Sequence, residues 1–128
     1  MSGLDITPQV PVGRQLIQSY GDMRFRIAGQ VYEGSVLVFP EKTTPWPVRD
    51  AAAATFESLS PILAAATGVE ILVLGCGRQF LPPPSNLRAA LKSAGIALEW
   101  MDTGAACRTF NVLLVEDRRA AAALIAVP

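Results

Sequence analysis

The segment VEILVLGCGRQFLPPPSNLRAALKSAGIALEWM, residues 69–101, contains the strongest fold signal in the chain. Its β-branched beginning, over residues 69–74, and its end, over residues 96–101, each predict a buried strand. Between them, two leucines four positions apart and a following Gly95 predict a helix over residues 85–94. A strand, a loop, a helix and a second strand in this order form a βαβ unit, so the two strands are expected to run parallel with a right-handed crossover.

The residues after this unit predict one more helix and leave the last segment open. Residues 103–116 place Ala106, Phe110, Leu113 and Leu114 on one stripe, as in a helix that packs on a core. The four consecutive alanines at residues 120–123 favour a helix over residues 118–127, whereas the aliphatic residues near the chain end also fit a final strand. The pattern alone does not decide between these two.

The N-terminal third predicts a tail followed by a hairpin. Residues 1–13 contain glycine and proline breakers without a sustained period, so we expect a tail there and a single α/β domain over residues 14–128. Alternation over residues 23–28 and an apolar run over residues 31–39 predict two antiparallel strands joined at Gly29-Gln30. We expect Gly34 to mark a bulge in the second of these strands.

Prolines limit the helices that can form between the hairpin and the βαβ unit. The Pro45-Trp46-Pro47 sequence predicts an extended segment or loop. Ser60 before Pro61 is typical of a helix start, so we predict a helix from about residue 59 to residue 67, and leave residues 48–56 unassigned.

Composition bounds the function of this 128-residue chain. Its 11 basic and 11 acidic side chains cancel, which argues against a nucleic-acid partner, and no stretch reaches the roughly 18 apolar residues of a membrane span. The start of the chain does not resemble a signal peptide, so we expect a soluble cytoplasmic protein without stable membrane insertion. The chain has no histidine, which excludes Ser-His-Asp and Cys-His catalytic units and the common zinc motifs.

A candidate binding crevice follows from the predicted parallel strands. Ligands of open α/β sheets bind outside the carboxyl ends of such strands, and two polar loops are expected there. The glycines of the first loop do not complete a dinucleotide-binding fingerprint, so no cofactor is expected. The candidate residues are Gly75, Cys76, Gly77, Arg78, Asp102, Thr103 and Asn111.

The cysteines and one charged cluster have simpler interpretations. Cys76 and Cys107 do not have zinc-ribbon or CxxC spacing, so no metal is expected and both are interpreted as small core residues. Cys76 as a nucleophile beside Arg78 is the less favoured alternative, because no histidine can serve as its base. Glu116 and Arg118 are interpreted as a structural ion pair at the end of the predicted helix.

Three motifs together resemble a known family of small domains. They are DTGAACRTFN at residues 102–111 with the following Glu116 and Arg118, the GCG of residues 75–77 after a buried strand, and Gly34-Ser35 in an early strand. In this order they resemble the family of mitochondrial complex I (NADH:ubiquinone oxidoreductase) assembly factor 3. That family also contains the adipogenesis-associated domain protein and many uncharacterised bacterial proteins. Cys76 departs from the family, which more often has threonine at this position.

The resemblance implies a fold and, less specifically, a function. It implies a three-layer α/β domain with a mixed central sheet and a packed β-hairpin, and it implies a final strand near residues 119–125. The mitochondrial relatives help to assemble the peripheral arm of complex I, whereas the bacterial members have no established activity.

Two hypotheses for the function follow. The first is a non-enzymatic interaction or assembly module that binds a protein partner, with respiratory-complex subunits implied by the resemblance. Its expected contact surface consists of apolar residues on predicted loops, namely Trp46, Phe80, Leu81 and Pro82 to Pro84. The second hypothesis is a small-molecule or anion-binding protein, or an enzyme, that uses the candidate crevice. The sequence leaves the oligomeric state open.

Overall fold

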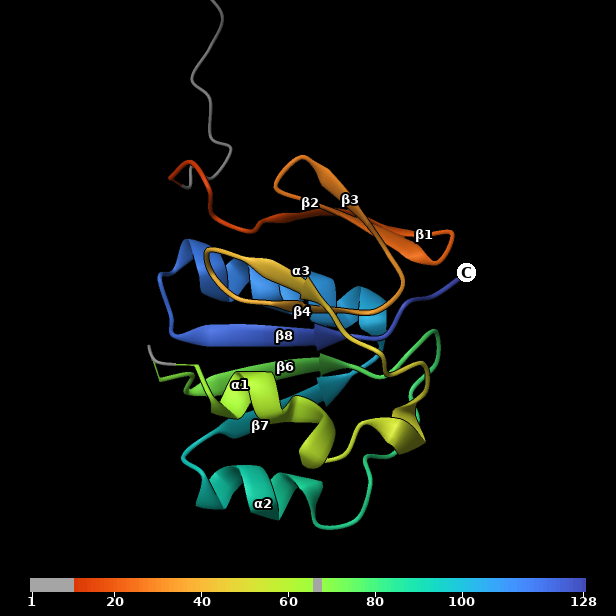
Figure 1. Cartoon of the computed structure of the whole chain (residues 1–128), viewed down its shortest axis with the longest axis vertical. Coiled ribbons are helices and arrows are strands. Elements are labelled where there is room, and N and C mark those ends of the chain that lie inside the picture. Colours follow the sequence, from red (N-terminus) through yellow and green to blue (C-terminus); the bar gives the residue numbers. More distant parts are fainter. Residues whose placement is uncertain (1–10, 66–67) are drawn as a thin grey trace, which may run out of the picture.

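A computed structural model describes residues 11–65 and 68–128, so most of the predicted tail, residues 1–10, lies outside the described residues. Within this range the chain forms two β-sheets and three α-helices (Figure 1). One sheet is antiparallel, with the order β1-β2-β3. The other is mixed, with the order β5-β4-β8-β6-β7. The predicted α/β class with a mixed central sheet is confirmed.

The mixed sheet contains the predicted βαβ unit. Its strands are β4 (Val36–Val38), β5 (Thr43–Pro45), β6 (Ile71–Gly75), β7 (Ala97–Met101) and β8 (Ala120–Leu124). β6 and β7 are parallel neighbours, as predicted, and helix α2 (Leu87–Ser93) lies between them in the chain. β8 pairs in parallel with the other edge of β6. β4 pairs in the antiparallel direction with the remaining edge of β8.

The central position of β8 explains why an alanine-rich segment forms a strand. All five residues of β8 are buried. A strand between two neighbours makes backbone hydrogen bonds on both edges, and this tertiary context outweighs the helix propensity of alanine. The final strand implied by the family resemblance is therefore confirmed.

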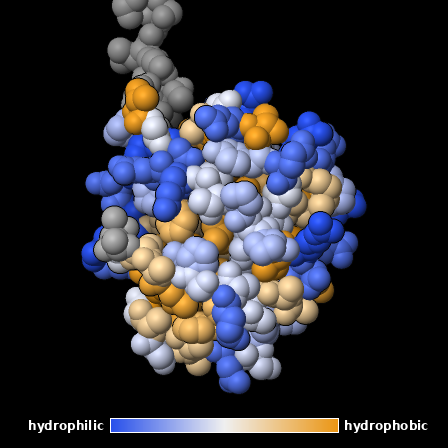
Figure 2. All heavy atoms as spheres, in the orientation of Figure 1, coloured by the Kyte–Doolittle hydropathy of each residue, from blue (hydrophilic) through white to orange (hydrophobic). Residues whose placement is uncertain are grey.

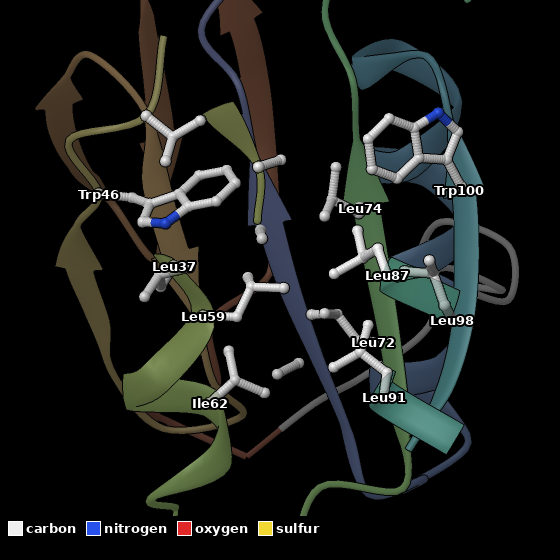
Figure 3. Close-up of a cluster of buried hydrophobic side chains, with 14 of the residues drawn as sticks. Leu37, Trp46, Leu59, Ile62, Leu72, Leu74, Leu87, Leu91, Leu98 and Trp100 are labelled. Carbon is white, nitrogen blue, oxygen red and sulfur yellow. The ribbon is translucent and has the colours of Figure 1, made fainter. Parts of the chain in front are cut away.

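Each face of the mixed sheet is covered by a different layer. Helix α3 (Thr103–Val115) and the antiparallel sheet share one apolar core with the first face, through Phe110 of the helix and Phe25 of the sheet. The other face packs against helix α1 (Ser60–Leu63), α2 and two 3-10 turns, η1 (Ala51–Ala53) and η2 (Glu57–Leu59). Figure 3 shows side chains from these helices meeting those of the sheet, with Trp46 and Trp100 at opposite sides of the cluster.

The N-terminal sheet contains the predicted hairpin and one further strand. It has three strands, β1 (Ile17–Gly21), β2 (Arg24–Ile27) and β3 (Gln30–Glu33). β2 and β3 pair in the antiparallel direction on either side of Gly29, so the predicted hairpin is confirmed. Its second strand is shorter than the predicted residues 31–39, because the chain leaves this sheet at Gly34 and enters the mixed sheet as β4. Gly34 has a φ of +79°, which suits a sharp corner, so it is not a bulge within one strand. β1 was not predicted, because its IQSYG sequence lacks apolar alternation.

The helix predicted over residues 59–67 is also only partly correct. Pro61 does lie in the first turn of α1, but the helix is only four residues long, and the Ser60 side chain does not cap it. The predicted end at residues 66 and 67 lies outside the described residues. No helix in the described part of the chain is long and apolar enough to cross a bilayer.

Candidate functional site

The two loops of the predicted crevice are neighbours in the structure. Gly75 and Met101 are paired at the carboxyl ends of β6 and β7, and the Cys76 N–H donates to the Met101 carbonyl at 2.8 Å. The loops are joined a second time by the Thr103 N–H, which donates to the Gly77 carbonyl at 2.9 Å. The residues from Gly75 to Gly77 therefore lie against the start of α3.

The space between these loops is filled by Thr103. Its side chain is fully buried. The Thr103 Oγ1 accepts a hydrogen bond from the Gly77 N–H at 3.0 Å and donates one to the Ile125 carbonyl at 2.8 Å. A Cβ atom placed on Gly75 would lie 2.8 Å from Thr103 Cα, so glycine is the residue that allows α3 to approach β6 this closely. The two glycines and the threonine thus form a tight strand-to-helix contact.

The other candidate residues are distributed around this contact. The Asp102 side chain caps α3 by accepting a hydrogen bond from the Ala105 N–H at 2.9 Å. Arg78 is exposed. Asn111 lies two turns further along α3, where its amide accepts from the Ile17 N–H and donates to the Ile17 carbonyl, both at 2.8 Å. Asn111 therefore fastens the antiparallel sheet to α3.

Both cysteines are buried free thiols, as the sequence predicted. The Cys76 Sγ lies 3.5 Å from the Gln79 carbonyl oxygen and 3.5 Å from the Leu81 nitrogen, which ties the loop after β6 to the strand end. Burial raises the pKa of the Cys107 thiol from 9.0 to about 12. Cys107 is therefore a neutral thiol at physiological pH, which does not suit a nucleophile.

Glu116 and Arg118 do not form the predicted ion pair. The ion pairs among the described residues join Arg14 to Asp117, Arg24 to Glu33 and Arg119 to Glu70. Asp117 has a φ of +57°, and the Arg118 N–H donates to the Leu113 carbonyl at 3.0 Å, so the end of α3 is closed by a Schellman motif. This geometry turns the chain into β8 without any Glu116–Arg118 contact.

The predicted apolar contact surface divides into a buried part and an exposed part. Trp46 is buried and its Nε1–H donates to the Ser58 carbonyl at 2.9 Å, so its assignment to the contact surface is wrong. Phe80 and Leu81 are exposed, by 62% and 53%. The Leu81 carbonyl accepts a hydrogen bond from Trp100 Nε1 at 2.6 Å, which holds the backbone of this loop while its side chains face solvent.

A cavity that the sequence did not predict lies at the opposite ends of the parallel strands. It has a volume of about 810 Å³ and is bounded by the β4–β5 turn, the end of α1 and the turn between α3 and β8. In Figure 1 the arrows of β6 and β8 point to the right, whereas the β4–β5 turn and the α3–β8 turn lie at the left. No group of three or more metal-binding side chains occurs within residues 11–65 and 68–128.

Comparison with known proteins places this geometry in a family. The model of a family described as a protein of unknown function (DUF498/DUF598) matches residues 17–125. An uncharacterised protein of Rhodobacter capsulatus is 36% identical over 96% of this chain and 95% of its own length. The NADH dehydrogenase [ubiquinone] 1 alpha subcomplex assembly factor 3 of Danio rerio is 39% identical over 88% of this chain, which spans only 65% of that protein. A crystal structure from Bartonella henselae, described as that of an outer membrane protein, has a TM-score of 0.83 at 38% identity, over 91% of this chain and 98% of that one.

Proposed function

We propose, from the premise that the chain belongs to the DUF498/DUF598 family, that it acts by binding another protein and not by catalysing a reaction. The curated relatives that are named as complex I assembly factors make a respiratory-complex subunit the first partner to test. We place this binding in the cytoplasm. The observation that carries the proposal is the exposed Phe80–Leu81 pair on a loop whose backbone is fixed.

Three features make this loop a suitable binding element. Trp100 Nε1 holds the Leu81 carbonyl, the Cys76 Sγ contacts the backbone on both sides of Phe80, and three prolines follow. Binding surfaces lose affinity when side chains and loops must be ordered on association, so a loop that is already fixed avoids part of that loss. Aromatic residues and arginine are enriched at protein interfaces, and the exposed Phe80 and Arg78 lie on the same loop.

The alternative is a small-molecule or anion site between the Gly75–Arg78 and Asp102–Thr103 loops. It is the weaker proposal because the Thr103 side chain occupies the space between the loops and uses its hydroxyl for two internal hydrogen bonds. Among the candidate residues, Arg78 is the side chain that an anion could reach from solvent without displacing this contact.

Affinity capture with a matched pair of surface variants tests the proposal. Tagged wild type, the double variant Phe80→Gln/Leu81→Gln, and the control Val112→Gln would be expressed in host cells that lack the endogenous copy. Val112 is an apolar residue on α3 with 56% exposure, so the control removes a similar exposed side chain elsewhere. We expect complex I subunits to be enriched with the wild type and the control, and the double variant to lose at least 80% of that enrichment, as about 1 kcal/mol of lost binding predicts.

Two results would contradict the proposal. One is the absence of any enriched respiratory subunit with the wild type at physiological salt. The other is equal enrichment with wild type and the double variant, which would show that the Phe80–Leu81 loop is not the contact. Circular dichroism of all three proteins checks that the substitutions leave the fold intact.

A further inference from the structure

The cavity at the amino ends of β6 and β8 combines an apolar wall with basic side chains. Phe39, Pro61 and Val69 are among its apolar lining residues. Figure 2 shows hydrophobic colouring gathered over α1 and α2 on the face it depicts, with hydrophilic colouring around the antiparallel sheet. A volume of about 810 Å³ falls within the range of pockets that hold small organic ligands.

Basic groups outnumber acidic groups in this cavity. Its charged lining residues are Arg14, Lys42, Arg118, Arg119, Glu41 and Asp117. Arg119 pairs with Glu70 and Arg14 pairs with Asp117. Lys42 and Arg118 form no ion pair among the described residues, and with Glu41 counted against them the cavity keeps an excess of one positive charge. On a chain whose net charge is zero, this local excess favours an anion.

Arg14 is held in place by its neighbours and has unused hydrogen-bonding capacity. The Gln15 N–H donates to the Pro40 carbonyl at 3.0 Å, and the Gln15 Oε1 accepts from Thr43 Oγ1 at 2.7 Å, which fixes this segment beside the β4–β5 turn. Arg14 Nη2 donates to Asp117 Oδ1 at 3.1 Å, but within residues 11–65 and 68–128 the buried Arg14 Nε has no acceptor. A guanidinium can bind a carboxylate through two parallel N–H groups, so the single contact to Asp117 uses only part of this capacity.

Asp117 is positioned to give way to a ligand. Its side chain is 90% exposed, and the Schellman motif fixes its backbone independently of the ion pair. The Arg14 side chain is only 15% exposed, so a competing anion that takes the place of Asp117 keeps this guanidinium paired, while the exposed Asp117 carboxylate returns to water.

We propose that this cavity binds a small organic anion that consists of an apolar body and one carboxylate group. The carboxylate takes the place of Asp117 at Arg14, with Lys42 and Arg118 nearby, and the apolar body lies against Phe39 and Val69. Such a ligand keeps Arg14 Nη2 paired with a carboxylate and covers the apolar wall at the same time. This site is distinct from the Phe80–Leu81 loop, which follows the opposite end of β6.

Octanoate is a suitable probe for two reasons. Octan-1-ol has an alkyl chain of similar length without the charge, and acetate has the charge without the chain. Titration of the full chain, followed through backbone amide chemical shifts, is expected to give saturable shifts for Lys42, Arg118 and Ala120 with octanoate. Octan-1-ol and acetate are expected to bind at least tenfold more weakly. The amides of Phe80 and Leu81 serve as an internal reference that should not move.

Three variants separate specific binding from adsorption to an apolar surface. Arg118→Gln is expected to weaken octanoate binding about fivefold, and Asp117→Asn, which removes the competing carboxylate but tolerates the positive φ, is expected to strengthen it about threefold. Arg24→Gln removes an arginine from an ion pair outside the cavity and is expected to change nothing. The proposal is overturned if octanoate gives no saturable shifts at the cavity, if octan-1-ol binds as tightly, or if Arg118→Gln and Arg24→Gln behave alike.

Discussion

Replacing Thr103 with valine tests whether this residue belongs to a structural contact. Valine has nearly the same shape as threonine, but it lacks the hydroxyl that accepts from the Gly77 N–H and donates to the Ile125 carbonyl. Both backbone groups would remain buried without a partner, because the valine methyl that replaces the hydroxyl still fills the space and excludes water. A buried polar group left unsatisfied costs about 1–3 kcal/mol, so Thr103→Val is expected to lower the free energy of unfolding by about 3 kcal/mol.

Thr103→Ser is the matched control. Serine keeps the hydroxyl and removes one buried methyl group, which costs about 1 kcal/mol. Urea unfolding followed by fluorescence of Trp46 and Trp100 measures both variants, since both tryptophans are in the core. The expected result is a much larger fall in the urea midpoint for valine than for serine, with an unchanged m-value.

The reasoning is refuted if Thr103→Val unfolds within about 0.5 kcal/mol of wild type, the usual range of surface substitutions that remove no buried interaction. It is also refuted if the serine variant is the less stable of the two. Either outcome would mean that the two hydrogen bonds of the Thr103 hydroxyl contribute little net stability.

Three other substitutions test neighbouring contacts. Gly75→Ala is expected to destabilise the chain by about 2–3 kcal/mol in urea unfolding, because its Cβ would lie 2.8 Å from Thr103 Cα and this backbone atom cannot move aside easily. Asn111→Ala removes both hydrogen bonds to Ile17 and is expected to cost about 2 kcal/mol. Amide hydrogen exchange in β1 should rise more than exchange in β6. Burial raises the pKa of Cys107 from 9.0 to about 12, so the thiol ionises at a lower pH in the unfolded chain than in the folded protein. The free energy of unfolding is therefore unaffected by this group below pH 9 and falls as the pH rises from 9 towards 12. Wild type should lose up to about 1.4 kcal/mol per pH unit more than Cys107→Ala in that window, and an equal slope for the two proteins would contradict the raised pKa.

The βαβ unit could be predicted from sequence because its signals are local. Leucine spacing, a glycine after the helix and β-branched runs each act within a few residues, and they agree with one another from residue 69 to residue 101. β8 could not be predicted in this way, because its alanines form a strand only when β4 and β6 flank it. Gly34 illustrates the same limit, since a positive φ suits a bulge and a corner equally well and only the second sheet distinguishes them.

The candidate site shows how a sequence motif can be located correctly and yet have a structural role. The rule that ligands bind at the carboxyl ends of parallel strands led to Gly75, Gly77 and Thr103, and these residues do meet there. Each of them is used to bring α3 against β6, while Asp102 caps the helix and Asn111 fastens the antiparallel sheet to it.

The cavity instead forms from four segments that are distant in sequence, and their basic residues belong to no local pattern. Arg14 precedes β1, Lys42 lies in the β4–β5 turn, and Arg118 follows α3. Their convergence depends on the order β5-β4-β8-β6, which brings the turn after β4 beside the start of β8. Sequence motifs do not predict a site whose residues are brought together only by the order of the strands. For this chain, a ligand screen should therefore begin at the amino ends of β6 and β8.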